Sequence, residues 1–234
     1  MSWPRPVILL PLRKRYLLIL LGLALLLLGS WGVYSRAGFR KPPPAPEQFL
    51  AEALLKTASS RSFCFRVEAR LGEGGLISQV EGERAGPDAV HIRGTMYNSP
   101  VEFIQVGGTT YMRDPWTSKW LTLEGNRMWQ SDLFVAEFNP LGFLKFKEVL
   151  GVSYRGKEKV DGEQVVVLEC YPQLENPYLE MKYSDYYCKV WISPRDNRIR
   201  QLTLEGRAPG GRRGLFVGLK LWDYDRPLEV KPPV

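Results

Sequence analysis

SFCFRVEARL, residues 62–71, is the stretch of sequence that is most informative about the fold. Its alternate positions are apolar and the positions between them are mostly charged; the apolar residues are Phe63, Phe65, Val67, Ala69 and Leu71. Side chains of a strand alternate between its two faces, so this period of two indicates a strand with one face in a core and the other in solvent. Such half-covered strands are typical of antiparallel sheets.

The segments around this strand complete a mainly β (α+β) fold. Residues 47–60 carry apolar side chains at helical spacing after Pro46, a favourable first residue of a helix. Between residues 127 and 149 the alternation stops, and apolar residues around Pro140 predict a helical insertion. Turn signals such as Asp161-Gly162 separate further predicted strands, which span 76–84, 88–97, 100–106, 109–113, 118–123, 151–160, 163–171, 185–192, 198–206 and 214–224. A sheet of this size must curve to limit its exposed edges.

A transmembrane helix is predicted for Tyr16–Ser35, which contains no charged residue. Twenty helical residues span roughly 30 Å, the thickness of the hydrocarbon core of a bilayer. Tyr16 at one end and Trp31 and Tyr34 at the other fit the aromatic belts of the headgroup regions. A cleaved secretory signal is the alternative, but the run is long for one and no small-x-small cleavage site follows it.

The predicted helix divides the chain into four parts. Residues 1–15 form a short cytoplasmic tail, 16–35 the signal anchor, 36–46 a proline-rich spacer and 47–234 an extracytoplasmic domain. The basic cluster Arg13-Lys14-Arg15 favours this orientation, because basic residues are retained on the cytoplasmic side. We therefore expect a single-pass protein of the cell membrane with its C-terminal domain outside the cytoplasm.

The net charge of +7 belongs to the anchor and not to the domain. Seven of the 32 basic residues, and no acidic residue, lie in residues 1–45, so residues 46–234 carry 25 basic and 25 acidic side chains. Nucleic-acid binding needs a basic surface, so the sequence argues against it.

Two of the three cysteines are candidates for a disulfide. Cys170 and Cys188 lie on the apolar faces of two neighbouring predicted strands, at equal distances from the centre of the connection between them. An oxidising exterior permits such a bridge, and two buried thiols are the alternative. Cys64 falls on the polar side of its strand. The cysteine spacing predicts no metal site.

The sequence gives no positive case for an enzyme or for a cofactor. His91 is the only histidine, and its position in the alternation places it on the polar face of a strand. Every Ser-His-Asp or Cys-His scheme would depend on this one residue. No nucleophile elbow, P-loop or dinucleotide fingerprint is present.

Large apolar side chains are the remaining candidates for a binding site. They either fill the core or line an apolar pocket, as ligand sites commonly do. The candidates for a cavity lining are Phe63, Phe65, Val67, Phe103, Phe134, Phe138 and Trp191.

The order of these elements resembles the lipoprotein-carrier (LolA-like) superfamily, which includes LppX/LprG-type and MucB/RseB-type envelope proteins. The resemblance rests on GERAGPDAVHIRG, on the hairpin IQVGGTTYMRDPWTSKW and on VDGEQVVVLECYP followed by KVWISPRDNRIRQLTLEG. It implies an unclosed half-barrel whose concave face is plugged by helices and whose apolar cavity holds acyl chains. It also implies a role in carrying or sensing lipids or lipoproteins, although an anchor helix is predicted for this chain and the predicted anchor is not followed by a lipobox cysteine.

We therefore expect a membrane-anchored domain that binds a lipid or an acylated molecule in the half-barrel cavity. The alternative is a protein-interaction or envelope-stress sensor module whose cavity is filled by its own side chains.

Overall fold

The computed structural model describes residues 44–72, 76–125, 139–210 and 213–233. The predicted anchor with Tyr16, Trp31 and Tyr34 lies outside the described residues, as do Phe134 and Phe138. Among the residues that are described, no helix is long and apolar enough to cross a membrane. The region from Ala45 to Val234 forms one compact unit.

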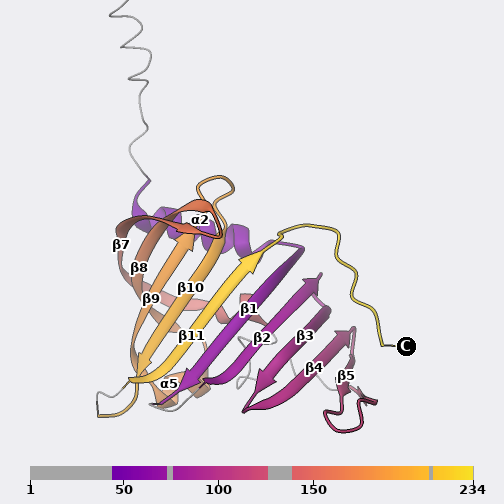
Figure 1. Ribbon diagram of the computed structural model, residues 1–234. Helices are drawn as coiled ribbons and strands as arrows, with labels where there is room; N and C mark the ends of the chain where they lie inside the picture. The colour runs from indigo at the N-terminus through magenta and orange to yellow at the C-terminus, as the bar shows by residue number, and fades with distance from the viewer. Residues whose placement is uncertain (1–43, 73–75, 126–138, 211–212, 234) are drawn as a thin grey trace, which may run out of the picture. The chain divides into compact units, whose positions relative to one another are not determined.

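In this described part of the chain, eleven antiparallel strands form a single unclosed sheet (Figure 1). The spatial order is β6-β5-β4-β3-β2-β1-β11-β10-β9-β8-β7, so two meanders meet where β1 pairs with β11. Their bounds are β1 (Ser62–Leu71), β2 (Leu76–Ala85), β3 (Ala89–Met96), β4 (Ser99–Val106), β5 (Thr109–Arg113), β6 (Trp120–Glu124), β7 (Phe146–Val160), β8 (Glu163–Leu174), β9 (Ser184–Ile192), β10 (Ile199–Arg207) and β11 (Arg213–Trp222). The predicted mainly β sheet is confirmed, and β1 has the bounds expected from its alternation.

Strand β7 begins earlier than its sequence indicates. We expected residues 146–149 to belong to the helical insertion, but they pair with the end of β8 through Phe146 and Leu174. The register of this pair shifts three times, and Gly151 and Gly156 have φ values of 58° and 114°. Such bulges interrupt the period of two and bend a strand, which explains why the alternation around residue 150 is hard to recognise.

Three described helices accompany the sheet: α2 (Pro46–Ala58), α4 (Pro140–Phe143) and α5 (Pro177–Lys182). Helix α2 buries Phe49, Leu50 and Ala53 against the sheet, and the backbone N–H of Ile199 donates a hydrogen bond of 3.0 Å to Thr57 Oγ1. Helix α5 was not predicted, although Asn176 caps it by accepting a 3.0 Å hydrogen bond from the N–H of Leu179. Helices α2 and α5 lie near opposite ends of the strands (Figure 1).

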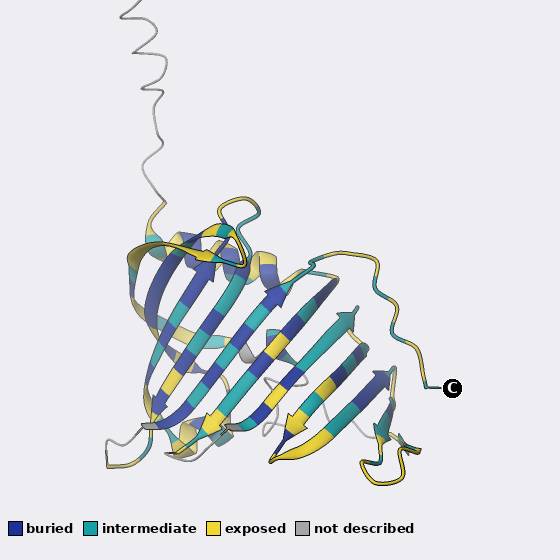
Figure 2. Ribbon diagram, in the orientation of Figure 1, coloured by how far each residue is buried: buried dark blue, intermediate teal, exposed yellow. Residues whose placement is uncertain are grey.

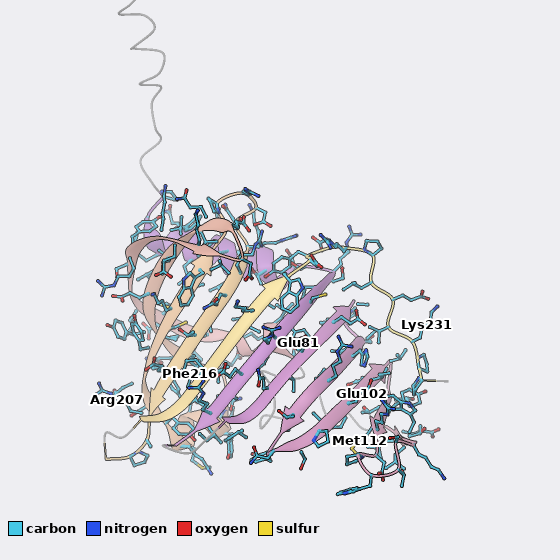
Figure 3. All side chains as sticks on the ribbon, in the orientation of Figure 1. Glu81, Glu102, Met112, Arg207, Phe216 and Lys231 are labelled. Carbon is cyan, nitrogen blue, oxygen red and sulfur yellow. The ribbon has the colours of Figure 1, made fainter. Side chains whose placement is uncertain are left out.

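The two faces of the sheet differ in chemistry. The inner face carries the main core, which includes the fully buried Phe63, Phe65 and Val67 of β1 and leucines of β10 and β11. The outer face carries ion pairs such as Arg66–Glu81 and Arg113–Glu102; Glu81 and Glu102 are labelled in Figure 3. Figure 2 shows the resulting alternation of buried and exposed residues along the strands. The inner face is therefore the more apolar of the two and carries the main core.

Candidate ligand-binding groove

A groove of about 1300 Å³ lies between α2, α4 and the segment that follows β11. We call it the α2–α4 groove. Its described walls are mainly apolar, and four of its residues, Leu54, Leu141, Phe146 and Val149, also pack against the main core. Pockets for organic ligands usually measure about 300–1,000 Å³ and have apolar walls with a few polar groups. The groove is larger than this range, so an organic ligand would fill part of it, and its lining is that of a ligand site.

Helix α2 provides one wall of the groove because its side chains point in two directions. Phe49, Leu50, Ala53 and Thr57 face the core, whereas Leu54, Leu55 and Ala58 face the groove. Leu55 is 71 % exposed. An exposed leucine beside half-buried ones forms an apolar surface that the described residues do not cover.

A second pocket of about 1450 Å³ lies beside α5, at the end of β8, β9, β10 and β11. Its walls include Tyr171, Tyr183, Glu205, Arg207 and Phe216, of which Arg207 and Phe216 are labelled in Figure 3. This pocket is the larger of the two, but tyrosine hydroxyls and charged groups line it. The α2–α4 groove is the better candidate for an apolar ligand because its walls offer aliphatic side chains.

Charged groups lie at the edge of the α2–α4 groove, and one of them, the carboxylate of Asp225, is held by the protein itself. Asp225 Oδ1 accepts a 2.8 Å hydrogen bond from the backbone N–H of Arg61, and Arg198 pairs with the other carboxylate oxygen. The hydrogen bond from Arg61, together with the charge of Arg198, lowers the pKa of Asp225. Asp225 is thus held by hydrogen bonds from the protein, and its charge also interacts with that of Arg61.

The predicted cavity residues of β1 and β4 lie in the closed core. Phe63, Phe65 and Val67 are 0 % exposed and Phe103 is 7 % exposed. None of the four belongs to the described lining of the α2–α4 groove or of the α5 pocket. They fill the sheet's inner face, which was the alternative that their chemistry left open.

Trp191 lies on the outer face, and this corrects its inclusion among the cavity candidates. Its neighbours on β9, Val190 and Ile192, belong to the main core, so the alternation turns Trp191 to the other side. There it packs against Val165 and Val167, and its indole N–H donates a 2.8 Å hydrogen bond to Glu158. The residue was selected for its size, whereas its position in the alternation already indicated the outer face.

Cys170 and Cys188 pair directly across β8 and β9, as the sequence predicted. Both are buried free thiols in this structure, and burial raises the pKa of Cys188 well above its ordinary value. Directly opposed residues of antiparallel strands have Cα atoms about 4.5–5.5 Å apart, within the range that a disulfide spans. The disulfide therefore stays a prediction with suitable backbone geometry.

Thiol alkylation tests this pair. In folded protein we expect iodoacetamide to label Cys64 alone, because Cys170 and Cys188 are 0 % exposed. Denaturation without reductant is expected to add no label to protein exported to an oxidising compartment, and two labels to protein made in the cytoplasm. Intact mass distinguishes the two. Two added labels in exported protein would contradict the bridge.

His91 lies on the outer face, where its Nε2 is 3.0 Å from Glu102 Oε1 and its Nδ1 is 3.6 Å from Glu83 Oε1. Arg113 also donates a 2.9 Å hydrogen bond to Glu102. Burial alone would raise the pKa of Glu102, but the hydrogen bonds from Arg113 and His91 outweigh it and lower this pKa. Within the described ranges, no three His, Cys, Asp or Glu residues come together as metal ligands.

Sequence reasoning missed the groove itself and Arg84 in its wall. The groove combines lining residues from 51–62, 84–87, 139–149 and 225–228 with Glu175, and these segments are distant in the sequence. No periodicity indicates that these segments meet. Arg84 was recognisable in principle, because it lies four residues after Val80 and therefore on the same face of β2.

Solved structures resemble this fold, whereas no protein-family model and no curated protein matches the sequence. The lipoprotein LppX of Mycobacterium tuberculosis aligns with a TM-score of 0.58 at 16% identity, over 81% of this chain and 100% of LppX. LprF from Mycobacterium bovis aligns with a TM-score of 0.59 at 13% identity, over 82% of this chain and 98% of LprF. At these identities the likeness concerns the fold alone. The unclosed antiparallel sheet and these alignments show that the chain has the fold of LppX and LprF, in agreement with the resemblance of its sequence to LppX/LprG-type proteins.

Proposed function

We propose that this protein binds a lipid, or the acyl chains of an acylated molecule, in the α2–α4 groove. The observation that carries the proposal is the apolar wall formed by α2, α4 and the start of β7, where Leu54, Leu55 and Leu141 lie beside a hollow of about 1300 Å³. Each methylene removed from water contributes about 0.8 kcal/mol. The binding free energy of an acyl chain that fills part of the groove is therefore favourable even after the entropic cost of ordering the chain.

The proposed setting is the outer surface of a cell membrane. The apolar run Tyr16–Ser35 supports an anchor, and the proline-rich residues 36–46 support an extended spacer of about 3.1 Å per residue. A tethered domain receives, presents or senses its ligand at the membrane and does not carry it away. Fold and sequence both favour lipid or lipoprotein handling over catalysis.

A protein-interaction or sensor module is the second candidate, and one surface favours it. Leu150 and Tyr171 are directly opposed on β7 and β8 and are 50 % and 49 % exposed. The ring of Tyr171 lies 5.8 Å from that of Tyr187 on β9. An exposed aromatic strip of this kind is typical of contact surfaces between proteins.

Photocrosslinking in the full-length chain tests the lipid proposal. The protein is purified in detergent, exposed to a phosphatidic acid and a diacylglycerol that carry the same photoactivatable acyl chain, irradiated and mapped by peptide mass spectrometry. We expect crosslinks at Leu54–Ala58 and Leu141–Val149. Ala58→Trp should reduce them at least about fivefold, because an indole on this exposed groove position occupies the space of the acyl chain.

Lys56→Trp is the matched control, since Lys56 is an exposed residue of the same helix outside the described groove lining. This variant should keep the native crosslinks. Equal loss in both variants, or crosslinks from both probes confined to residues 16–35, would contradict binding in the groove and favour the interaction module.

A further inference from the structure

Arg84 is a basic residue on the apolar face of the sheet. Its direct neighbours in register are Phe63 on β1 and Val90 on β3. These two side chains are 0 % and 3 % exposed and belong to the main core. Arg84 itself is half-buried and lines the α2–α4 groove. A cation in such surroundings is costly unless a hydrogen-bonded partner compensates it.

No carboxylate pairs with Arg84 in the part of the chain that the structure describes. Its guanidinium donates a hydrogen bond to the carbonyl oxygen of Pro87. Burial lowers the pKa of Arg84, and the charge of Asp88 opposes this shift without forming an ion pair. A guanidinium offers five N–H donors in a planar fork, so most of its hydrogen-bonding capacity stays available.

Two further basic residues of the groove also lack an ion-pair partner among the described residues. Arg61 and Lys145 are exposed lining residues, and neither side chain has an ion-pair partner within the described ranges. By contrast, Arg66 on the outer face pairs with Glu81, and Arg113 on the same face pairs with Glu102. Residues 46–234 hold equal numbers of acidic and basic side chains. The described lining contains more basic than acidic residues, namely Arg61, Arg84, Lys145 and Arg226 against Glu175 and Asp225, so positive charge is in local excess beside an apolar wall.

We propose that the ligand of the α2–α4 groove is an anionic lipid whose phosphate or carboxylate accepts hydrogen bonds from Arg84. This inference rests on the function proposed above and names its ligand class. The acyl chain lies along the leucines of α2 and α4, and Arg61 and Lys145 contribute positive charge at the edge. Arg84 fits this role because its planar fork matches the oxygens of a phosphate or carboxylate.

The test compares the two photoactivatable probes, which differ only in headgroup. In the native full-length chain, phosphatidic acid should label the groove about tenfold more strongly than diacylglycerol at equal concentration. A charge-assisted hydrogen bond to the headgroup strengthens binding by about this factor. Arg84→Gln should remove this preference and keep the diacylglycerol signal. Arg84→Lys should retain part of it, since a lysine keeps the charge but loses the fork.

Arg93→Gln is the matched control. Arg93 is an exposed arginine on the outer face of the adjacent strand β3, so its replacement should leave the preference unchanged. Equal groove labelling by both probes in the native chain would overturn the anionic specificity while leaving lipid binding intact. Loss of phosphatidic acid labelling in millimolar inorganic phosphate would identify a site for a free anion and would also overturn it. Absence of groove labelling by either probe would instead reject the function on which this inference rests.

Discussion

Replacement of Phe65 by alanine should lower the free energy of unfolding by about 3–5 kcal/mol, the usual cost of removing a buried aromatic ring. Phe65 is 0 % exposed and lies on β1, between β2 and β11 at the middle of the sheet. Its ring centroid is 6.0 Å from that of Phe63. The ring also lies directly over Gly82, where the Cβ of any larger residue would collide with it, so the core is closely packed at this point.

Urea unfolding of the full-length chain, followed by near-ultraviolet circular dichroism, measures this loss. Phe216→Ala is the matched control, because Phe216 is half-buried on the outer face of the adjacent strand β11, with the Arg70 guanidinium 5.2 Å from its ring. We expect the control to lose about 1 kcal/mol, the contribution of a partly exposed cation–π contact and its buried area. Equal losses in the two variants would contradict the assignment of the inner face as the core.

Local sequence patterns were sufficient to predict most of the sheet. The alternation of Phe63, Phe65 and Val67 identifies the inner face of β1, and Asp161-Gly162 identifies the hairpin between β7 and β8. These features depend on neighbouring residues only, so one sequence reveals them. The six residues of α5 are too few to show a helical period, and the bulges of β7 interrupt the period of two.

The site was harder to predict because it depends on tertiary contacts. Arg84, Leu141 and Leu228 line one groove although they come from β2, α4 and the C-terminal segment. Their meeting follows from the curvature of the sheet and from the position of α2, and neither is encoded in a local pattern. Large aromatic residues were natural candidates for a lining. The aromatic side chains of β1 and β4 are instead buried in the core, where they stabilise the sheet beside the groove.

Replacement of Gly94 by alanine should lower the free energy of unfolding by at least about 3 kcal/mol, because strain and a backbone clash combine. Gly94 has a φ of 152° and pairs with Val80 of β2. A Cβ at this position would collide with the carbonyl oxygen of Gln79 and would lie 2.7 Å from Val80 Cα. Backbone atoms of a paired strand cannot rotate away as a side chain can, so the β2–β3 ladder must distort.

Gly108→Ala is the control for the loss of a glycine as such. Gly108 lies in the turn between β4 and β5, has no positive φ, and offers open space to an added Cβ, with no heavy atom within 4 Å. We expect this variant to change the free energy of unfolding by no more than about 0.5 kcal/mol, or to raise it slightly. The same β2–β3 ladder holds Arg84 against Val90, so Gly94→Ala should also weaken the preference for phosphatidic acid in the protein that still folds. A Gly94→Ala variant as stable as Gly108→Ala would contradict the close approach of β3 to β2.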